Sequence, residues 1–326
     1  MKKINDFSIG QRLETVLVVI SATARKTKAG KPYLQLELFD GIEKISGNYW
    51  DWAGVNIPEV NAILDVTGQV TEWQGCKQLN IASISTNTEH HISEFAPTSG
   101  VDIGEVYKDA FALASNIHDY FLRGLSLSVL EALRSRWLEV PAAKTVHHAF
   151  VGGTLIHSLS VAKIALAISK QIPDSNDDLC CAGGLLHDIG KLYTYTVNGI
   201  TVGMTDEGML YDHVFMGAEF IGNFVDNLTL HAEDDIGGKL EMLRHIILSH
   251  HGKLEFGAAV PPMSIEAHIV NKADEIDSSV QQIIEASRKI TDAKFTERIY
   301  TLGNRPHLTP QYVRDTMMNE DDLPFK

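Results

Sequence analysis

Histidine and aspartate residues in the second half of the chain are spaced in a way that could bind metal ions. His187 and Asp188 are adjacent and begin the string HDIGK, which follows an apolar run at residues 179–186. His157 lies upstream, after a Gly-Gly pair, and Asp274 lies far downstream. Imidazole nitrogens combined with carboxylate oxygens suit Mn, Fe, Co, Ni or Zn better than Mg, which prefers oxygen ligands and water. We therefore expect these four residues to bind one of these divalent transition metals.

Three more histidines are further candidate metal ligands. His213 lies at the start of a predicted helix, and His250 and His251 follow the apolar run 246–249. His213 could instead be an ordinary helix N-terminal residue, and the pair could simply end a helix, where a protonated ring meets the negative end of the dipole. We expect His213 and at least one of the pair to be ligands, with His250 ahead of His251.

Lys191 and a further histidine pair are candidates for contacting a substrate. Lys191 ends the HDIGK string and could bind phosphate and stabilise transition-state charge, although a plain helix C-terminal lysine would have the same pattern. His147 and His148 could touch a substrate phosphate or only pack against the fold. We expect Asp188 and Lys191 to be the catalytic residues.

The order of these residues resembles the HD superfamily of metal-dependent phosphohydrolases. His157, the pair His187-Asp188 and Asp274 occupy the places of that family's motif, and HDIGK is its most specific part. The resemblance implies that these four residues are metal ligands. His213 and the pair after residue 249 match the branch of the superfamily that binds two metals.

The elements in front of this motif have the pattern of a small β-barrel. Leu34, Leu36 and Leu38 alternate with more polar residues, which is typical of a half-buried strand. Further strands are expected at 12–24, toward 49–50, at 66–70 and at 78–84, with turn signals at Asp40-Gly41 and Gln74-Gly75. Five short strands with a break at 56–61 favour an OB-type barrel.

The rest of the chain has a helical pattern. Residues 89–103 have little periodicity and are expected to be a linker. Helices are expected at about 104–122, 126–137, 153–171, 177–188, 213–227, 236–250 and 262–288, with a loop or small hairpin at 193–211. We therefore predict two domains: a small all-β OB-type barrel at 1–88 that binds nucleic acid, followed by an all-α HD domain at 104–326.

The predicted barrel carries aromatic and basic residues that could bind a single-stranded nucleic acid. Aromatic side chains offer stacking surfaces for bases, and basic loops follow a phosphate backbone. The alternative is that the aromatics are core residues and the loop is a solvated turn. The aromatic candidates are Tyr33, Tyr49, Trp50, Trp52 and Trp73, with Tyr33 and Trp50 preferred, and the basic candidates are Arg25, Lys26, Lys28 and Lys31.

The whole arrangement resembles the YhaM-type 3′→5′ exoribonucleases. The barrel, the linker, the segment 144–150, HDIGK and the string SHHG at 249–252 follow one another as in that family. The resemblance implies a barrel that binds single-stranded RNA, or DNA as well, and an HD domain that releases nucleoside 5′-monophosphates from the 3′ end with Mn²⁺ or a related ion. It also implies in-line attack on phosphorus by a hydroxide that the ions hold.

Charge and composition limit the location and the partners. The net charge of −14 argues against a generally basic nucleic-acid-binding surface, but residues 1–88 contain nine Lys/Arg and nine Asp/Glu and are neutral. No apolar run could cross a bilayer, and the two N-terminal lysines are not followed by a signal-peptide core. The three cysteines form no disulfide framework. We expect a cytoplasmic protein without a membrane partner; assembly into a homo-oligomer is left open.

Four other functions remain as alternatives at this point. An HD-domain nucleotidase and a cyclic-dinucleotide phosphodiesterase would use the same metal site, but the sequence KLEFG after residue 252 lacks the Gly-Tyr-Pro of the second group. An HD-fold di-iron oxygenase would use the same ligands for oxidation. A binding module with a decayed HD domain is disfavoured because every expected ligand position is occupied. RNA, a cyclic dinucleotide and mononucleotides assayed side by side separate the hydrolases.

Overall fold

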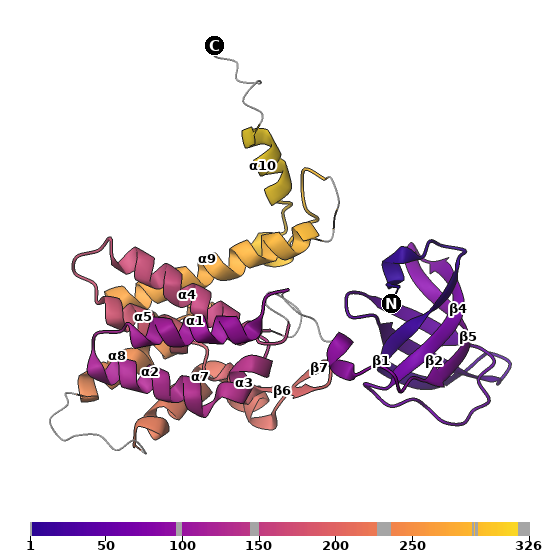
Figure 1. The fold of residues 1–326 in the computed structure, drawn as a ribbon, viewed down its shortest axis with the longest axis horizontal. Coiled ribbons are helices and arrows are strands. Elements are labelled where there is room, and N and C mark those ends of the chain that lie inside the picture. Colours follow the sequence, from indigo (N-terminus) through magenta and orange to yellow (C-terminus); the bar gives the residue numbers. More distant parts are fainter. Residues whose placement is uncertain are drawn as a thin grey trace, which may run out of the picture. The chain divides into compact units, whose positions relative to one another are not determined.

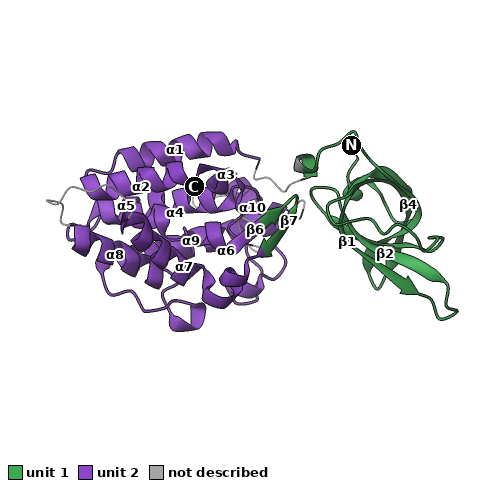
Figure 2. Ribbon diagram, turned by 90° about the horizontal axis from the view of Figure 1, so that it is seen from below, with its two compact units in different colours: residues 1–98, 197–203 green, residues 99–196, 204–326 purple. Residues whose placement is uncertain are grey.

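The protein folds into two compact units, which are described separately. The computed structural model describes residues 2–95, 100–143, 150–226, 236–288, 290 and 293–318. The first unit contains residues 1–98 and 197–203, and the second contains residues 99–196 and 204–326 (Figure 2). The boundaries 1–88, 89–103 and 104–326 that we expected for domains and linker stay a prediction.

The first unit is a closed barrel of five strands (Figure 1). The strands are β1 (Arg12–Lys26), β2 (Pro32–Phe39), β3 (Lys44–Tyr49), β4 (Ile63–Trp73) and β5 (Cys76–Thr86). They pair in the order β1-β2-β3-β5-β4, and β1 also pairs with β4, which closes the barrel. All pairs are antiparallel except β3 with β5. This order is that of an OB-fold, so the predicted fold of this unit is confirmed.

Alternation of apolar residues builds the barrel core. Leu34, Leu36 and Leu38 on β2 are all at most 1% exposed, while the residues between them are partly exposed. The long strand β1 serves two neighbours because a bulge between Val19 and Ser21 shifts its register against β2. Inward-facing side chains on both halves of β1 therefore contact one barrel core.

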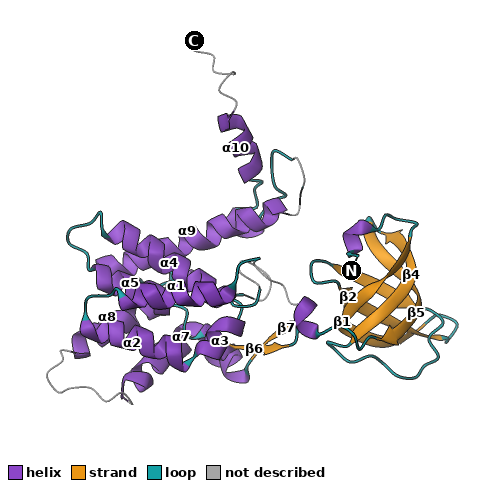
Figure 3. Ribbon diagram, viewed as in Figure 1, coloured by secondary structure: helices purple, strands orange, loops and turns teal. Residues whose placement is uncertain are grey.

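The second unit is a bundle of helices (Figure 3), and most of the small hairpin at residues 195–204 belongs to the first unit. The helices that hold the site are α4 (Gly153–Ser169), α5 (Asp177–Leu186), α6 (Lys191–Thr194), α7 (Asp206–Asp226), α8 (Ile236–Ser249) and α9 (Ile265–Arg288). The others are α1 (Ile103–Ser115), α2 (Tyr120–Ala132), α3 (Arg134–Glu139) and α10 (Pro310–Met318). The hairpin is β6 (Tyr195–Asn198) with β7 (Thr201–Met204), within the segment predicted as a loop or hairpin.

Side-chain caps explain where several helices begin. Asp102 accepts a hydrogen bond from the Gly104 amide at α1, and Asn176 accepts one from the Leu179 amide at α5. The helix expected at 104–122 is wrong in its extent, because α1 ends at Ser115 and Asp119 caps the new helix α2. The carboxylate cap of Asp119 starts a new helix there, although the apolar pattern of the sequence continues across the break.

Helices α4 and α5 form the centre of the unit. Both pack against α9 and against each other, and α5 is buried from Leu179 to Leu186. At the α4–α5 contact, a Cβ on Gly184 would lie 2.6 Å from the Cα of Ala162, so the two backbones touch directly. This close packing sets the position of His157 on α4 against that of His187, which follows α5. None of the helices in the described part of the chain is long and apolar enough to cross a membrane.

Candidate metal centre

Four predicted residues from three parts of the bundle meet in the interior. His157 lies on α4, His187 and Asp188 follow α5, and Asp274 lies on α9. The two histidines and Asp188 are at most 1% exposed. The Nε2 atom of His157 lies 3.2 Å from the Nε2 of His187, 3.3 Å from Asp188 Oδ2 and 3.1 Å from Asp274 Oδ1. Nitrogen and carboxylate donors thus converge on one point, as a transition-metal site requires.

The three further histidines lie beside this group. His213 from α7, His250 and His251 have donor atoms within 4.8 Å of one another. Asp188 Oδ1 connects the two groups, because it lies 3.4 Å from His213 Nε2 and 3.6 Å from His250 Nε2. All seven predicted ligands are therefore brought together around Asp188.

Four buried atoms in this centre have no hydrogen-bond partner among the described residues. They are Asp188 Oδ1, His213 Nε2, His250 Nε2 and His251 Nδ1. Leaving a buried polar atom unsatisfied costs about 1–3 kcal/mol, so a cluster of four is expensive unless a ligand pairs with them. A cation coordinated by these atoms satisfies all of them, and the residues present fit a divalent transition metal.

Hydrogen bonds from behind fix the orientation of the histidine rings. His187 Nδ1 donates to the Gly184 carbonyl at 2.8 Å, and His250 Nδ1 donates to the Ile247 carbonyl at 2.6 Å. His157 Nδ1 lies 2.7 Å from Asp277 Oδ2. Each of the three rings is held through Nδ1 and presents Nε2 to the centre, which is the arrangement of outer support typical of metal-binding histidines.

The electrostatics of the centre favour a positive charge between the carboxylates. Burial would lower the pKa of His157, but Asp188, Asp274 and Asp277 outweigh it and hold that pKa well above its ordinary value. Burial would likewise raise the pKa of Asp188, but the charges of Lys191 and His187 lower it well below its usual range. A site that stabilises a proton on this imidazole also attracts a metal cation to the same atoms.

Two histidines on the other side, His250 and His251, are kept neutral. Burial is the main reason that the pKa of His250 lies well below its ordinary value, and the neighbouring His251 adds to it. Burial also lowers the pKa of His251, with His213 as the next cause. A neutral imidazole has the free lone pair that a metal ligand needs.

Lys191 lies inside the centre. Its side chain is about one-tenth exposed, and its Nζ lies 2.7 Å from Asp188 Oδ2. Burial would lower the pKa of Lys191, but Asp188 outweighs it and raises that pKa. The lysine is therefore a fixed positive charge next to the carboxylate that connects the two groups.

Gly190 brings the HDIGK string against α7. The backbone of Gly190 is right-handed, and α6 begins directly after it, so no left-handed conformation requires a glycine here. A Cβ at this position would lie 1.9 Å from the His213 carbonyl oxygen and 2.7 Å from the Gly217 amide. The glycine is needed because the two backbones touch, and this contact places His213 beside Asp188.

Helix α7 is interrupted just before His213. Asp212 has φ 63° and ψ 157°, a conformation that non-glycine residues rarely adopt. Its carboxylate contacts both the backbone amide and the Nδ1 of His213. The hydrogen bond to His213, ahead of the opposing effect of burial, lowers the pKa of Asp212 to about 2. The kink thus turns the imidazole inward and supports it with a carboxylate.

A pocket beside the centre contains residues that the sequence analysis missed. It has a volume of about 720 Å³, and His251 and Asp274 form part of its wall. Lys253, Phe256 and Lys272 also line it, and Lys253 Nζ lies 5.1 Å from the centre of the Phe256 ring. These residues come from the segment after α8 and from α9, so only the fold brings them together. His147 and His148, which we expected near the substrate, lie outside the described residues.

The barrel presents only part of the predicted nucleic-acid surface. The rings of Tyr33 and Trp50 lie 4.5 Å apart, and Trp50 is 42% exposed. Trp52 belongs to the core, so the prediction that it could offer a stacking surface is wrong. Tyr49 is partly buried against the core and stays a candidate. The basic residues Arg25, Lys26, Lys28 and Lys31 are exposed, and Lys31 pairs with Asp51 at 2.9 Å.

A hollow of about 500 Å³ on the barrel adds candidates that periodicity did not indicate. Trp50 lines it together with Arg12, Gln69 and Asn80. Trp50 follows β3, and the other three come from β1, β4 and β5, which are distant in sequence. The hollow combines one aromatic ring, one guanidinium and two amides with the carboxylate of Asp51, so it offers a stacking face and polar groups for a base.

Comparisons with known proteins agree with this description. Residues 154–279 match the family model of the HD domain, and this segment contains all seven predicted ligands. Over 318 residues the chain is 29% identical to a protein of Listeria welshimeri serovar 6b that is named 3′-5′ exoribonuclease YhaM. The match covers 95% of this chain and 99% of that relative.

Two solved structures are similar to part of the chain. A chain of a replication protein A heterotrimer bound to ssDNA matches 26% of this chain and 64% of its own length, with 17% identity and a TM-score of 0.21. The second OB-fold domain of replication protein A from Methanococcus maripaludis matches 28% of this chain and 97% of its own, with 19% identity and a TM-score of 0.23. The strand order remains the basis for the barrel assignment. The protein is an HD-domain protein with an N-terminal OB-like barrel, homologous along nearly its whole length to the YhaM 3′-5′ exoribonuclease.

Proposed function

We propose that this protein is a metal-dependent 3′→5′ exoribonuclease that releases nucleoside 5′-monophosphates from single-stranded RNA and acts on DNA as well. The observation that carries the proposal is the cluster of seven buried or half-buried ligands with four unpaired donor atoms around Asp188. The similarity to the Listeria protein extends over both units and supports a nuclease over other HD-domain hydrolases.

Two divalent ions fit the two groups of donors. We assign one ion to His157, His187, Asp188 and Asp274, and the other to His213, His250 and His251, with Asp188 between them. The mixed nitrogen and oxygen donors are consistent with manganese, and iron, cobalt, nickel or zinc would suit the same set. When bound, the ions supply an activated water and neutralise the charge of the phosphate oxygens.

The residues of the chain have separate tasks around the scissile phosphate. Asp188 presents one oxygen to each group of histidines, so it sets the spacing between them. Lys191 holds a positive charge next to Asp188 and stabilises the negative charge that develops on phosphorus-bound oxygens. The half-buried Asp274 lies at the open side, where the neighbouring pocket gives access to the centre.

The pocket beside the centre suits the 3′-terminal nucleotide. Phe256 offers an exposed ring for a base, and Lys253 and Lys272 offer charges for a phosphate. On the barrel, Tyr33 and Trp50 offer a second stacking surface, and Arg12, Arg25, Lys28 and Lys31 offer charges for the strand behind. We expect the barrel to raise affinity for a strand without taking part in hydrolysis.

The test is a product assay combined with elemental analysis. We expect a 5′-labelled RNA to shorten stepwise from its 3′ end with release of nucleoside 5′-monophosphates, and up to two ions to be bound per chain. Asp188→Asn should lose both the activity and bound metal, whereas His118→Ala, a change at a 94% exposed histidine, should lose neither. Full activity in metal-free protein would overturn the mechanism.

The same assay separates the other reactions. Hydrolysis of mononucleotides without shortening of RNA would identify a nucleotidase, and cleavage of a cyclic dinucleotide alone would identify that class of phosphodiesterase. Turnover that depends on O₂ with iron-loaded protein would identify an oxygenase.

A further inference from the structure

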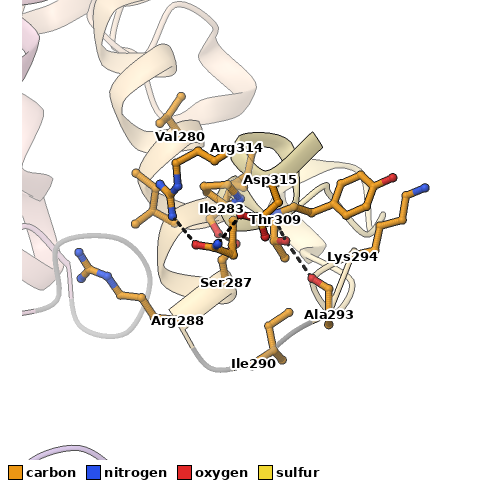
Figure 4. A pocket seen from close by; sticks show the side chains of 14 residues that line it. Val280, Ile283, Ser287, Arg288, Ile290, Ala293, Lys294, Thr309, Arg314 and Asp315 are labelled. Atoms are coloured by element: carbon orange, nitrogen blue, oxygen red, sulfur yellow. Dashed lines mark hydrogen bonds between the residues drawn. The ribbon is translucent and has the colours of Figure 1, made fainter. Parts of the chain in front are cut away.

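A second pocket in the helical unit lies where α9 ends and α10 folds back (Figure 4). Its volume is about 830 Å³, larger than the pocket beside the metal centre. Thr309 connects the two elements, because its hydroxyl donates to the Ala293 carbonyl at 2.8 Å and its amide donates to the Lys294 carbonyl at 3.0 Å. These bonds hold the start of α10 against the segment after α9, so the pocket is part of the fold.

Three cations surround this pocket. Arg288 lies at the end of α9, Lys294 on the connecting segment and Arg314 on α10, and all three are exposed. Within the described part of the chain, none of them lies within ion-pair distance of a carboxylate; Arg314 instead donates to Gln311 at 2.9 Å. Unpaired cations repel one another and attract an anion.

The residues that line this pocket carry a basic excess, whereas the unit as a whole is acidic. Residues 89–326 contain 19 Lys/Arg against 33 Asp/Glu. The lining contains three basic side chains and one acidic side chain, Asp315, which accepts a hydrogen bond from Gln311 at 2.7 Å. A local basic excess on an acidic unit attracts anions.

The walls of the pocket are apolar and include one aromatic ring. Ile283 and Ile284 of α9 and Ile290 line one side. Tyr312 of α10 lines the other, and Lys294 Nζ lies 4.6 Å from the centre of its ring. A phosphate alone would use the cations but leave the apolar walls empty. A ligand that has both an anion and a flat, weakly polar part uses both.

We propose that this pocket binds a nucleotide unit, with its base against Tyr312 and the isoleucines and its phosphate at the cations that line the pocket, of which Arg288 and Lys294 lie on opposite sides (Figure 4). The unit could be one residue of an RNA strand or a free nucleotide, which share this chemistry. The pocket is distinct from the metal centre, although both lie along α9.

The distance along α9 favours an RNA strand. Asp274 and Ser287 are thirteen residues apart on this helix, which is about 20 Å at 1.5 Å per residue. A stacked strand covers that distance with about six nucleotides at 3.4 Å each. A strand whose 3′ end lies in the metal centre is therefore long enough to reach the pocket. This part of the inference rests on the proposed nuclease function.

The experiment measures RNA binding to the full-length protein in EDTA, so that no hydrolysis occurs. Fluorescence anisotropy with a 5′-labelled 12-nucleotide RNA compares wild type with the double variant Lys294→Glu/Arg314→Glu. The control is Lys108→Glu/Lys163→Glu, which changes the charge equally at two exposed lysines of α1 and α4. We expect the pocket variant to bind the RNA at least about tenfold more weakly than the control, because it loses charged hydrogen bonds to phosphate. Equal losses in both variants would overturn the proposal.

Two further measurements distinguish the ligand's source and the two sites. Calorimetric titration with AMP shows whether a free nucleotide binds, and its loss in the pocket variant but not in the control would assign a free nucleotide to this pocket even if RNA is not a substrate. Hydrolysis of bis-p-nitrophenyl phosphate reports on the metal centre, and we expect the pocket variant to retain it. If neither AMP nor RNA distinguishes the two double variants in properly folded protein, the pocket does not bind nucleotides.

Discussion

The two units place their candidate functional residues in opposite environments. In the barrel, Tyr33, Trp50 and the basic loop lie at the surface, and the interior is almost purely apolar. In the helical unit, the interior contains five charged or titratable side chains within a few ångströms of one another: His157, His187, Asp188, Lys191 and His250. A protein interior tolerates such a cluster only when its members pair or bind an ion. The buried titratable cluster of the helical unit is therefore the candidate for chemistry, whereas the exposed aromatic and basic residues of the barrel are the candidates for reversible binding.

The largest expected effect comes from the buried centre. Asp188→Asn keeps the shape of the side chain but removes the charge that both groups of histidines share. We expect the rate of RNA hydrolysis to fall about 10³-fold or more, because metal binding and charge stabilisation are lost together. Single-turnover assays of wild type and variant in the same excess of divalent metal measure this fall. A loss below tenfold would mean that Asp188 does not connect the two groups.

A smaller change in the same unit should affect its stability. Gly190→Ala places a methyl group against the His213 carbonyl, and we expect the free energy of unfolding to fall by about 3 kcal/mol or more. Urea denaturation measures it. Gly124→Ala is the control, because this exposed glycine of α2 has open space around it and should gain about 0.5–1 kcal/mol. Equal stability of both variants would show that α7 can move away from residue 190.

Removing a residue that only orients a metal ligand should reduce activity less than removing a metal ligand. Asp277→Ala removes the carboxylate that holds His157 from behind. We expect the metal affinity to fall about 10- to 100-fold, while saturating metal restores most of the activity. Competition with a coloured chelator measures the affinity. Failure of rescue at saturating metal would indicate that Asp277 binds the ion directly.

The exposed surface of the barrel should affect binding without affecting chemistry. Trp50→Ala removes the ring that lies against Tyr33, and we expect the affinity for RNA to fall about tenfold, within the range of one lost stacking interaction. Hydrolysis of a small diester should not change. Trp73→Ala is the control, since Trp73 is 66% exposed and contributes to neither the stack nor the hollow. Equal losses from both tryptophans would argue against a defined stacking site.

The smallest effect concerns the thiols of the two units. Burial raises the pKa of Cys180 and of Cys181 to about 12, so almost no thiolate forms below about pH 10. Cys76 in the barrel is exposed. We expect iodoacetamide at pH 8 to modify one cysteine in the native protein and three after denaturation, as mass spectrometry would show. Rapid modification of all three without denaturant would indicate frequent opening of α5.

The HDIGK string and the histidines around it predicted which residues meet, because His157 lies on an apolar helix, α4, that packs directly against α5, which His187 and Asp188 follow. The break between α1 and α2 was missed, since Asp119 acts through a side-chain cap that an apolar pattern does not contain. The sequence did not predict why residue 190 is a glycine either. A Cβ there would collide with the backbone of α7, which only the fold brings close. Arg12, Lys253 and Phe256 could not be found from spacing, since distant segments bring them to their pockets.

Helix α9 has a mechanical consequence. It is a single element of 24 residues that contains Asp274 near its middle and lines the nucleotide pocket with its C-terminal end. A helix hardly stretches, so the distance between these two places is nearly constant. If a strand binds at both, α9 acts as a length gauge: RNA longer than about six nucleotides would engage both places, and shorter RNA only one. The products would then change from tightly held to easily released at a length that this helix determines.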